Sequence, residues 1–556
     1  MSFSIFPRVK RAVEKQGEFQ FDALRIFTVG AGASLARTLK ALRPEVCVRD
    51  ASRDEANVVL SVATVFSQKN EYCYLRILEE RMEIHCRDDE GARNAACILA
   101  QLIRQNGTGF SIPCGTIEDW PDAQYRGFML ESSGRSWLSM ERICLYIREM
   151  AMARMNVLQF HFMEGPGCTI RLDCYPNWHG YGPDDLKYTK DEIRAMIAYA
   201  AELGVAVCPF VEVISHSTTF NYEAGIACPG DKDENMFAVC VGQEKTYEAI
   251  ERVLTEIAEL FPDPVLHIGG DEYDMSAVTP RTVHWDQCPY CRALSEKMGY
   301  TTYRELFFYA VERVNTIVNK LGKVSMLWNA DVKPYEAEVL SRNIVIHYYR
   351  CDNTLGKEKH YDLWPNDYVA DGFSLLNSQF PQTYIDLPDY VNAAKLSQWS
   401  YLTDPLIAPK NEAKVIGGCC CAWDDFKHFE RTIPPAIFLF ADRFWNAKGE
   451  SVAYDEHYAT LLTYAMFEGK LPEGMNVFRA VGDVLPPLKD DRKMHYRKLL
   501  ASKEEIGEIK SALDALAARG DLLAGVYADI AAASLEYLQN SRPADGPLKT
   551  AVKFEG

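Results

Sequence analysis

VLHIGGDEYDM, residues 265–275, is a short apolar run that ends in two glycines and two adjacent carboxylates, Asp271 and Glu272. Neighbouring side chains in a regular strand point to opposite faces, so adjacent acids in such a strand do not share one environment. Glycine, however, adopts backbone conformations that other residues avoid. Gly269 and Gly270 therefore predict the place where the strand leaves its pleat and turns both acids toward one pocket.

Seven further apolar runs alternate with amphipathic helical segments between Tyr125 and Trp445. Strands as apolar as these are buried on both faces, as in a parallel sheet. Eight such strands with helices between them predict a closed (β/α)₈ barrel, a TIM barrel. The runs are GFMLESS (127–133), VLQFHFM (157–163), VAVCPFVEV (205–213), VLHIGG (265–270), VSMLWNA (324–330), IVIHYY (344–349), GFSLLNS (372–378) and VIGGCCCAW (415–423).

The sequence on either side of the barrel predicts two further regions. Residues 1–122 mix short apolar runs with a helix from about Asp89 to Gln105, which indicates a small α/β domain ahead of the barrel. WPDAQ (120–124) marks the boundary, because a proline and a polar turn precede a new apolar run. We therefore assign the barrel to residues 123–446 and a helical C-terminal region to residues 447–556.

Composition and charge exclude several classes of function. The 556-residue chain has a formal net charge of −18 and no basic run, so a nucleic-acid partner is not expected. No stretch approaches the roughly 18 apolar residues of a membrane span, and the first residues lack the apolar core of a signal peptide. Several of the 17 cysteines lie in apolar runs, which is typical of reduced, buried thiols. We expect a cytoplasmic protein without a membrane partner.

Polar residues gather where the predicted strands end, which is where TIM barrels place their chemistry. Carboxylates and arginine hydrogen-bond hydroxyl groups, and indole rings pack against the C–H faces of a pyranose, so the set favours a sugar. An acidic mouth without lysine or Gly-rich loops disfavours phosphate esters. In strand order the residues are Glu131, Arg135, His161, Glu164, Glu212, His216, Asp271, Glu272, Trp328, Asn329, Asp331, Tyr348, Tyr349, Tyr384, Asp386, Trp399, Trp423, Asp424 and Asp425.

These residues also have plainer interpretations. The tryptophans taken singly are more often core packing, and His161 and His216 are equally consistent with structural histidines that hold carboxylates in place. A GGDE signature followed by an aromatic residue also occurs in nucleotide cyclases, where it lies on a hairpin. Here the acid pair ends a buried strand, and that context favours a catalytic role.

The segments RGFMLESSGR, NVLQFHF, YTKDEIRAMIAYAAELGVAVCPFVEVISHS, LHIGGDE and GGCCCAWDD together resemble family 20 glycoside hydrolases, the β-N-acetylhexosaminidases. The resemblance spans roughly residues 70–445, and its most specific element is H-x-G-G-D-E, from His267 to Glu272. It implies an exo-acting, retaining hydrolase that releases terminal β-linked N-acetylhexosamine, GlcNAc or GalNAc. The implied mechanism is substrate-assisted and passes through an oxazolinium intermediate.

The resemblance also implies a role for each site residue. Glu272 is the general acid, and its pKa is expected to be raised by burial and by a charged neighbour so that it holds a proton near neutral pH. Asp271, ionised, accepts the acetamide N–H, and Tyr384 hydrogen-bonds the acetamide oxygen. The remaining assignments are pocket walls for Trp328, Trp399 and Trp423, outer sugar hydroxyls for Arg135, Asp386 and Asp425, support of the acid–base network for His216, and a retained strand-end position for His161.

The outer part of the predicted site departs from the family pattern. Glu131 and Glu164 stand where the family usually has aspartates, and Gly165 stands where it has a second aspartate. Cys168 and Thr169 replace the usual Trp and Arg, and Phe210 and Asp425 each replace a usual glutamate. They leave the GlcNAc or GalNAc preference and the linkage open. The alternative is a catalytically inactive, carbohydrate-binding relic of the same fold. Retention of both Asp271 and Glu272 counts against it, because binding alone needs no proton donor.

One motif stands outside this mechanism, His284-x₃-Cys288-P-Y-Cys291. A CxxC pair can be half of a zinc site, but no second pair lies nearby in the sequence, so paired loop thiols are favoured and metal binding is left open. The proposed chemistry needs no metal or organic cofactor. We expect a small oligosaccharide or glycoconjugate as substrate; a homodimer is compatible with the sequence, which does not fix the oligomeric state.

Overall fold

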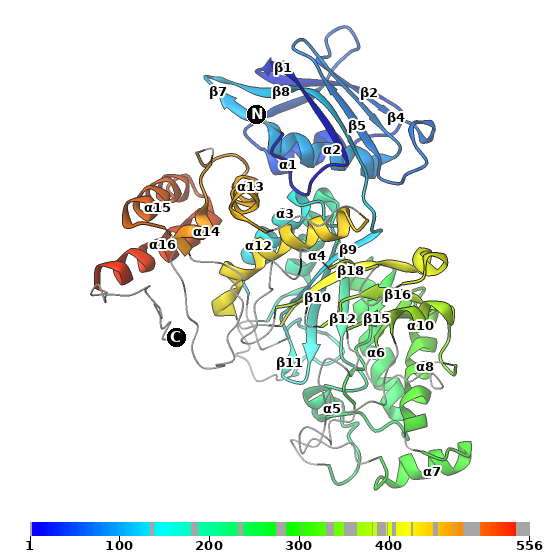
Figure 1. Ribbon diagram of the computed structural model, residues 1–556. Helices are drawn as coiled ribbons and strands as arrows, with labels where there is room; N and C mark the ends of the chain where they lie inside the picture. The colour runs from blue at the N-terminus through cyan, green and yellow to red at the C-terminus, as the bar shows by residue number, and fades with distance from the viewer. Residues whose placement is uncertain are drawn as a thin grey trace.

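Three parts follow one another along the chain in the computed structural model: an N-terminal sheet with helices on one face, a barrel, and a group of C-terminal helices beside the barrel (Figure 1). The structure describes residues 3–133, 138–178, 187–231, 237–273, 285–302, 304–329, 338–349, 364–380, 382–385, 396, 399–402, 407–423, 426–448, 454–472, 474–481 and 501–540.

The N-terminal sheet has the strand order β1-β8-β5-β6-β4-β2-β3, and β7 pairs with β8. Its helices lie on the face that looks toward the barrel, where α1 contacts α4 and α2 contacts α3 (Figure 1). Its elements are β1 Arg11–Phe21, β2 Ala23–Val29, α1 Ser34–Leu42, β3 Cys47–Asp50, β4 Val58–Val62, η1 Thr64–Phe66, β5 Cys73–Ile77, β6 Met82–Cys86, α2 Asp89–Leu102, β7 Arg104–Asn106 and β8 Gly109–Asp119. The predicted boundary at residue 122 falls between β8 and the first barrel strand.

The eight apolar runs all form parallel strands that close into a barrel. The order is β9-β10-β12-β13-β14-β15-β16-β18, and β18 pairs with β9 in parallel register, Cys419 opposite Gly127. The strands are β9 Tyr125–Glu131, β10 Val157–Glu164, β12 Ala206–Val211, β13 Val265–His267, β14 Val324–Trp328, β15 Val345–Tyr348, β16 Ser374–Asn377 and β18 Val415–Ala422, with two short additions, β11 Gly167–Cys168 and β17 Tyr384–Ile385.

Helices connect the barrel strands on the outside. The predicted helix between β10 and β12 has the expected capping box, Thr189 with Glu192, and ends at Gly204 in the left-handed conformation. The elements are α3 Met140–Met152, α4 Lys190–Leu203, α5 Thr218–Ala224, α6 Glu244–Leu260, α7 Pro289–Met298, α8 Arg304–Lys320, α10 Pro365–Ala370, η5 Pro409–Lys414 and α12 Phe426–Trp445.

The C-terminal region is helical, as predicted: α13 Glu456–Met466, α14 Val477–Val481, α15 Lys503–Ala517 and α16 Leu522–Asn540. The predicted fold class, a (β/α)₈ barrel preceded by a small α/β domain and followed by a helical region, is confirmed. Within the described ranges, no helix has the length and apolar character needed to cross a bilayer.

The barrel interior forms a hydrophobic cluster separate from the larger core that the outer helices share with the N-terminal domain. This separation follows from strand geometry, because alternate side chains of each strand point inward. The buried members of the interior cluster are Met129, Phe210, Met326, Trp328, Val345, Tyr349, Leu376, Tyr384, Cys419 and Cys421. Three histidines, His161, His267 and His347, are also fully buried within it.

A buried ion pair joins the N-terminal domain to the first and the last helix of the barrel, α3 and α12. Arg154, which follows α3, pairs with Asp119 at the end of β8, and both side chains are fully buried. Trp445 at the end of α12 donates its indole N–H to Asp119 Oδ1 at 2.9 Å, and the Arg154 guanidinium lies 4.2 Å from the centre of the Trp445 ring. Three segments distant in sequence are therefore held by one carboxylate.

We expect Asp119→Ala to lower the free energy of unfolding by about 3–5 kcal/mol, because it leaves the Arg154 charge buried and unpaired. Glu118→Ala is the matched control: it removes an ion pair with Arg11, which is 72% exposed, and a 3.2 Å hydrogen bond from the Tyr72 hydroxyl, so the loss should stay at about 1 kcal/mol. Urea unfolding followed by circular dichroism measures both. Equal losses for the two variants would show that the Asp119 pair does not carry the junction.

Candidate active site

The chain turns at the end of β13 through the two glycines. Gly269 has φ +69° and Gly270 φ +88°, and Glu272 also lies in the left-handed region at φ +49°. The strand pairing ends there, with Trp328 N donating to Gly269 O at 3.1 Å. The predicted departure from the pleat is confirmed, and it allows Asp271 and Glu272 to face the same side.

The carboxyl group of Glu212 explains why residue 269 must be glycine. A Cβ atom at this position would lie 1.8 Å from Glu212 Oε2. The neighbouring Gly270 N donates to the same oxygen at 2.9 Å. Glu212 follows β12 directly, so the end of one strand fixes the turn at the end of the next.

His216 lies at the centre of a ring of carboxylates. Its Nδ1 is 3.1 Å from Glu164 Oε1, and its Nε2 is 3.7 Å from Asp271 Oδ2 and 3.6 Å from Glu272 Oε2. The residue has φ +47°, an uncommon backbone conformation for a side chain of this size. One imidazole thus touches acids from the ends of β10 and β13.

The electrostatics of this cluster hold His216 in its charged form. Burial alone would lower the pKa of His216, but the carboxylates of Asp271, Glu164 and Glu272 raise it to about 10. The site therefore contains an imidazolium at neutral pH, and this cation offsets the mutual repulsion of the carboxylates.

The surroundings of Glu212 favour its protonated form. Burial, and then the charge of Asp271, raise the pKa of Glu212 well above its ordinary value. Glu212 is therefore the donor in its hydrogen bond with Asp271. Burial also raises the pKa of Asp271, while the charge of His216 and the Glu212 hydrogen bond oppose that rise.

The carboxylate network extends to the first two barrel strands. Ser133 Oγ donates to Glu131 Oε1 at 2.5 Å and lies 3.3 Å from Glu164 Oε2. His161 lies with these acids, since one ligand atom from each of Glu131, His161 and Glu164 falls within 4.8 Å of the others. The glutamates that depart from the family pattern are thus fully buried and hydrogen-bonded.

Aromatic rings line the mouth beside the acids. Trp423, at the end of β18, lies 6.4 Å from Trp328 and 6.3 Å from Tyr384, centroid to centroid. Tyr349 lies 5.1 Å from Trp328 and 6.1 Å from Tyr384. Burial, then Cys421 and Tyr349, and then Asp271 and Glu272, raise the pKa of Tyr384 well above its ordinary value. The Tyr384 hydroxyl therefore keeps its proton and can donate a hydrogen bond next to the acid pair.

A stack of buried rings in the barrel interior packs against this aromatic wall. Phe210 lies between His161 and His267, with centroids 3.9 Å from each. His267 Nε2 is 3.0 Å from His347 Nδ1, and Trp328 stacks on His347 at 3.9 Å. Burial lowers the pKa values of His267 and His347 well below the ordinary value, so both rings are neutral and pack as aromatic groups.

The structure separates one predicted residue from this cluster and leaves others outside its description. Trp399 is 2% exposed, donates its indole N–H to Gln379 Oε1 at 3.2 Å and faces Phe444 of α12 at 6.2 Å. Its assignment to the pocket wall stays a prediction. Arg135, Asp386, Asp425 and His284 lie outside the described residues.

The sequence pattern places Glu164 and Glu212 at strand ends without assigning them a role in the site, and it does not identify Phe237. Glu164 and Glu212 stand at predicted strand ends, and that position was the available signal. Phe237, whose ring edge packs on His216 at 4.4 Å, had no such signal, because it lies in a connecting segment.

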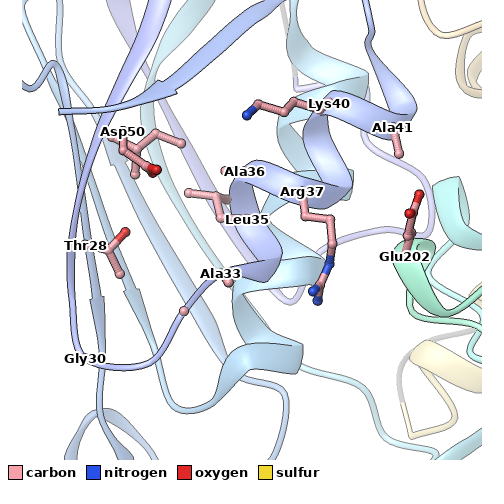
Figure 2. A pocket seen from close by; sticks show the side chains of 12 residues that line it. Thr28, Gly30, Ala33, Leu35, Ala36, Arg37, Lys40, Ala41, Asp50 and Glu202 are labelled. Carbon is pink, nitrogen blue, oxygen red and sulfur yellow. The ribbon is translucent and has the colours of Figure 1, made fainter.

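A hollow of about 760 Å³ lies away from the barrel mouth, between the N-terminal domain and α4. Figure 2 shows Thr28 and Asp50 on the strand side, Arg37 and Lys40 on α1, and Glu202 across from them. Its lining residues do not bring two carboxylates together beside an aromatic wall. The acid pair of β13 is therefore the candidate active site.

Comparison with known proteins matches both the barrel and the N-terminal domain to one family. The model of glycosyl hydrolase family 20, catalytic domain, matches residues 124–448, and the model of family 20, domain 2, matches residues 2–120. The β-hexosaminidase of Vibrio furnissii is 25% identical over 375 residues, 60% of this chain and 58% of that protein. The mouse β-hexosaminidase subunit alpha is 25% identical over 417 residues, 70% of this chain and 74% of that protein.

Two solved structures share the fold. A β-N-acetylhexosaminidase from Bacteroides fragilis has a TM-score of 0.71 and 22% identity, covering 83% of this chain and 95% of that one. A family 20 exo-β-N-acetylglucosaminidase from Vibrio harveyi, in complex with N-acetylglucosamine, has a TM-score of 0.68 and 20% identity, covering 84% and 76%.

The charge of His216 predicts a pH-dependent stability. Its pKa in the folded protein is about 10 against an ordinary 6.5, so its stabilising contribution is complete below pH 6.5 and is lost as the pH rises toward 10. The free-energy difference between the wild type and His216→Gln should therefore shrink over this window. Urea unfolding at several pH values measures it, with exposed His457→Gln as control. A difference that stays constant with pH would contradict the imidazolium.

Proposed function

The chain belongs to glycosyl hydrolase family 20, and from this premise we propose that it is a β-N-acetylhexosaminidase. It removes terminal β-linked N-acetylhexosamine from small oligosaccharides or glycoconjugates. The observation that carries the proposal is the pair Asp271 and Glu272, both within 3.7 Å of the His216 imidazole at the barrel mouth. The acetamido sugar fits the adjoining aromatic wall, because pyranose C–H faces pack on indole rings.

The two acids divide the work in the proposed mechanism. Glu272 gives its proton to the glycosidic oxygen while the substrate's acetamide carbonyl oxygen attacks the anomeric carbon, and the glycosidic bond breaks. A water molecule then adds to the oxazolinium, its proton passes to Glu272, and the sugar leaves with retained configuration. Asp271 accepts the acetamide N–H and stabilises the positive charge that develops on that group. The Tyr384 hydroxyl donates to the acetamide oxygen.

The surrounding groups position these acids. The His216 cation lies within 3.7 Å of both acids: it holds the ionised Asp271 in place and stabilises the carboxylate that Glu272 becomes once its proton has been given up. Protonated Glu212 donates to Asp271 and holds it as an acceptor aimed at the substrate. The wall of Trp328 and Trp423 orients the ring.

Exo-action rests on the sequence prediction that Arg135, Asp386 and Asp425 hold the outer hydroxyls. A cytoplasmic location and a homodimer likewise stay predictions. The inactive carbohydrate-binding alternative finds no support in the described residues, since binding alone does not require a proton donor beside Asp271.

We expect turnover of 4-nitrophenyl β-GlcNAc or β-GalNAc by the wild type, and the ratio of the two rates gives the sugar preference. Glu272→Gln should lose about 10²–10⁴-fold on a disaccharide with a poor leaving group and much less on the activated aryl glycoside. Asp271→Asn should lose activity on both, because it removes the charge that stabilises the oxazolinium.

Glu251→Gln provides an isosteric control on the exposed face of α6, where its side chain is 47% exposed, and should leave both rates unchanged. The absence of sugar release by the wild type across aryl glycosides and disaccharides of both sugars would overturn the proposal.

A further inference from the structure

Four cysteines from two distant segments meet on one side of the barrel. Cys228 and Cys240 lie in the segment between α5 and α6, and Cys288 and Cys291 lie at the start of α7. All four are buried, with at most 4% exposure. The pair that the CxxC motif lacks in the sequence is thus supplied by the fold.

The sulfur atoms lie at distances from one another that suit four ligands of one ion. Cys240 Sγ lies 3.6 Å from Cys288 Sγ and 3.7 Å from Cys291 Sγ, and Cys228 Sγ lies 3.9 Å from Cys291 Sγ. All four sulfurs lie within 4.8 Å of one another. A Zn–S bond of about 2.3 Å in tetrahedral geometry places sulfurs about 3.8 Å apart, whereas a disulfide needs about 2.05 Å. We propose that Cys228, Cys240, Cys288 and Cys291 bind a structural zinc ion.

The local backbone brings the segment that holds Cys228 and Cys240 close to the start of α7. Cys240 N donates to Ile226 O at 2.9 Å, which brings the stretch around Cys228 alongside Cys240. A Cβ at Gly242 would lie 2.3 Å from the Tyr290 carbonyl carbon, so a glycine is required where the two segments cross. This crossing sets the two cysteine pairs face to face.

The start of α7 favours thiolates. Cys288 is the N-cap residue and Cys291 lies in the first turn, where backbone N–H groups and the helix dipole stabilise negative charge. Binding replaces the four S–H protons, which pass to solvent, with one Zn²⁺. Four thiolates complete the tetrahedral preference of zinc, and softer thiolate ligands select it over magnesium or calcium.

The other cysteine-rich stretch of the barrel provides a contrast. Cys419, Cys420 and Cys421 are adjacent in β18, so alternate side chains point to opposite faces and the three cannot converge on one ion. Among the described residues, the four-cysteine cluster is the group in which four thiols, without any other type of ligand, lie close enough to bind one ion.

Two series of contacts lead from the four-cysteine cluster toward the acid pair. Val239 O, next to Cys240, accepts the Trp285 indole N–H at 2.9 Å, and Trp285 stacks on Tyr273 at 5.7 Å. Tyr273 directly follows Glu272. Phe237, from the same segment as Cys240, packs on His216. The ion therefore anchors a segment that contacts His216 and one that packs on Tyr273, and it plays no part in bond breaking.

The first test is the metal content of the full-length chain, produced in a reducing cytosol and purified without chelator or an immobilised-metal column. Elemental mass spectrometry should give about one zinc per chain. Cys288→Ser combined with Cys291→Ser should fall to less than about a tenth of that value. Cys97→Ser, which alters a buried cysteine of α2, should keep the full amount.

A second measurement on the wild type keeps the proposal testable if the double variant does not fold. After the zinc is exchanged for Co²⁺ under reducing conditions, tetrathiolate ligation should give intense charge-transfer absorption in the near-ultraviolet and d–d bands in the visible red. Removal of metal should make four further thiols reactive toward a disulfide reagent. Failure of the reduced wild type to retain zinc or cobalt, or intact-mass data showing these cysteines as two disulfides, would overturn the site. None of these readouts depends on glycosidase activity.

Discussion

The carboxylate cluster at the mouth of this barrel depends on one partly buried cation, the imidazolium of His216. Glu164, Asp271 and Glu272 approach within 3.7 Å of the His216 imidazole, and several carboxylates at such distances repel one another strongly where water is scarce. The imidazolium and the extra proton on Glu212 offset that repulsion. The left-handed turns at Gly269, Gly270 and His216 itself are the backbone consequences, because only these bends bring the groups to one point.

The sequence predicts local features of this architecture well. Apolar runs locate all eight strands to within a few residues, since burial on both faces leaves an unbroken hydrophobic signature. The glycines before Asp271 likewise mark the turn. Contacts that join distant segments leave no comparable trace: the proton sharing of Glu212 with Asp271, the packing of Phe237 on His216 and the meeting of four cysteines all require the folded chain. Trp399 shows the same limit, because periodicity does not tell which face of a loop a ring occupies.

Three of the departures from the family pattern, Phe210, Glu131 and Glu164, lie close together in the fold. Phe210 stands where a carboxylate is usual, and its ring packs between two buried histidines, His161 and His267. Glu131 and Glu164 reach one methylene further than aspartates and meet through Ser133. An apolar ring thus accompanies two longer, buried acids in the same part of the barrel.

The junction at Asp119 also bears on how the chain reaches its folded state. The partners of this carboxylate, Arg154 and Trp445, are separated by most of the barrel sequence, and β9 gains its second neighbour only when β18 pairs with it. During synthesis, the N-terminal domain is complete long before residue 415 leaves the ribosome. Until then β9 presents an unpaired apolar edge, which is a template for association with other chains. The barrel is thus a unit that closes only when its last strand is available.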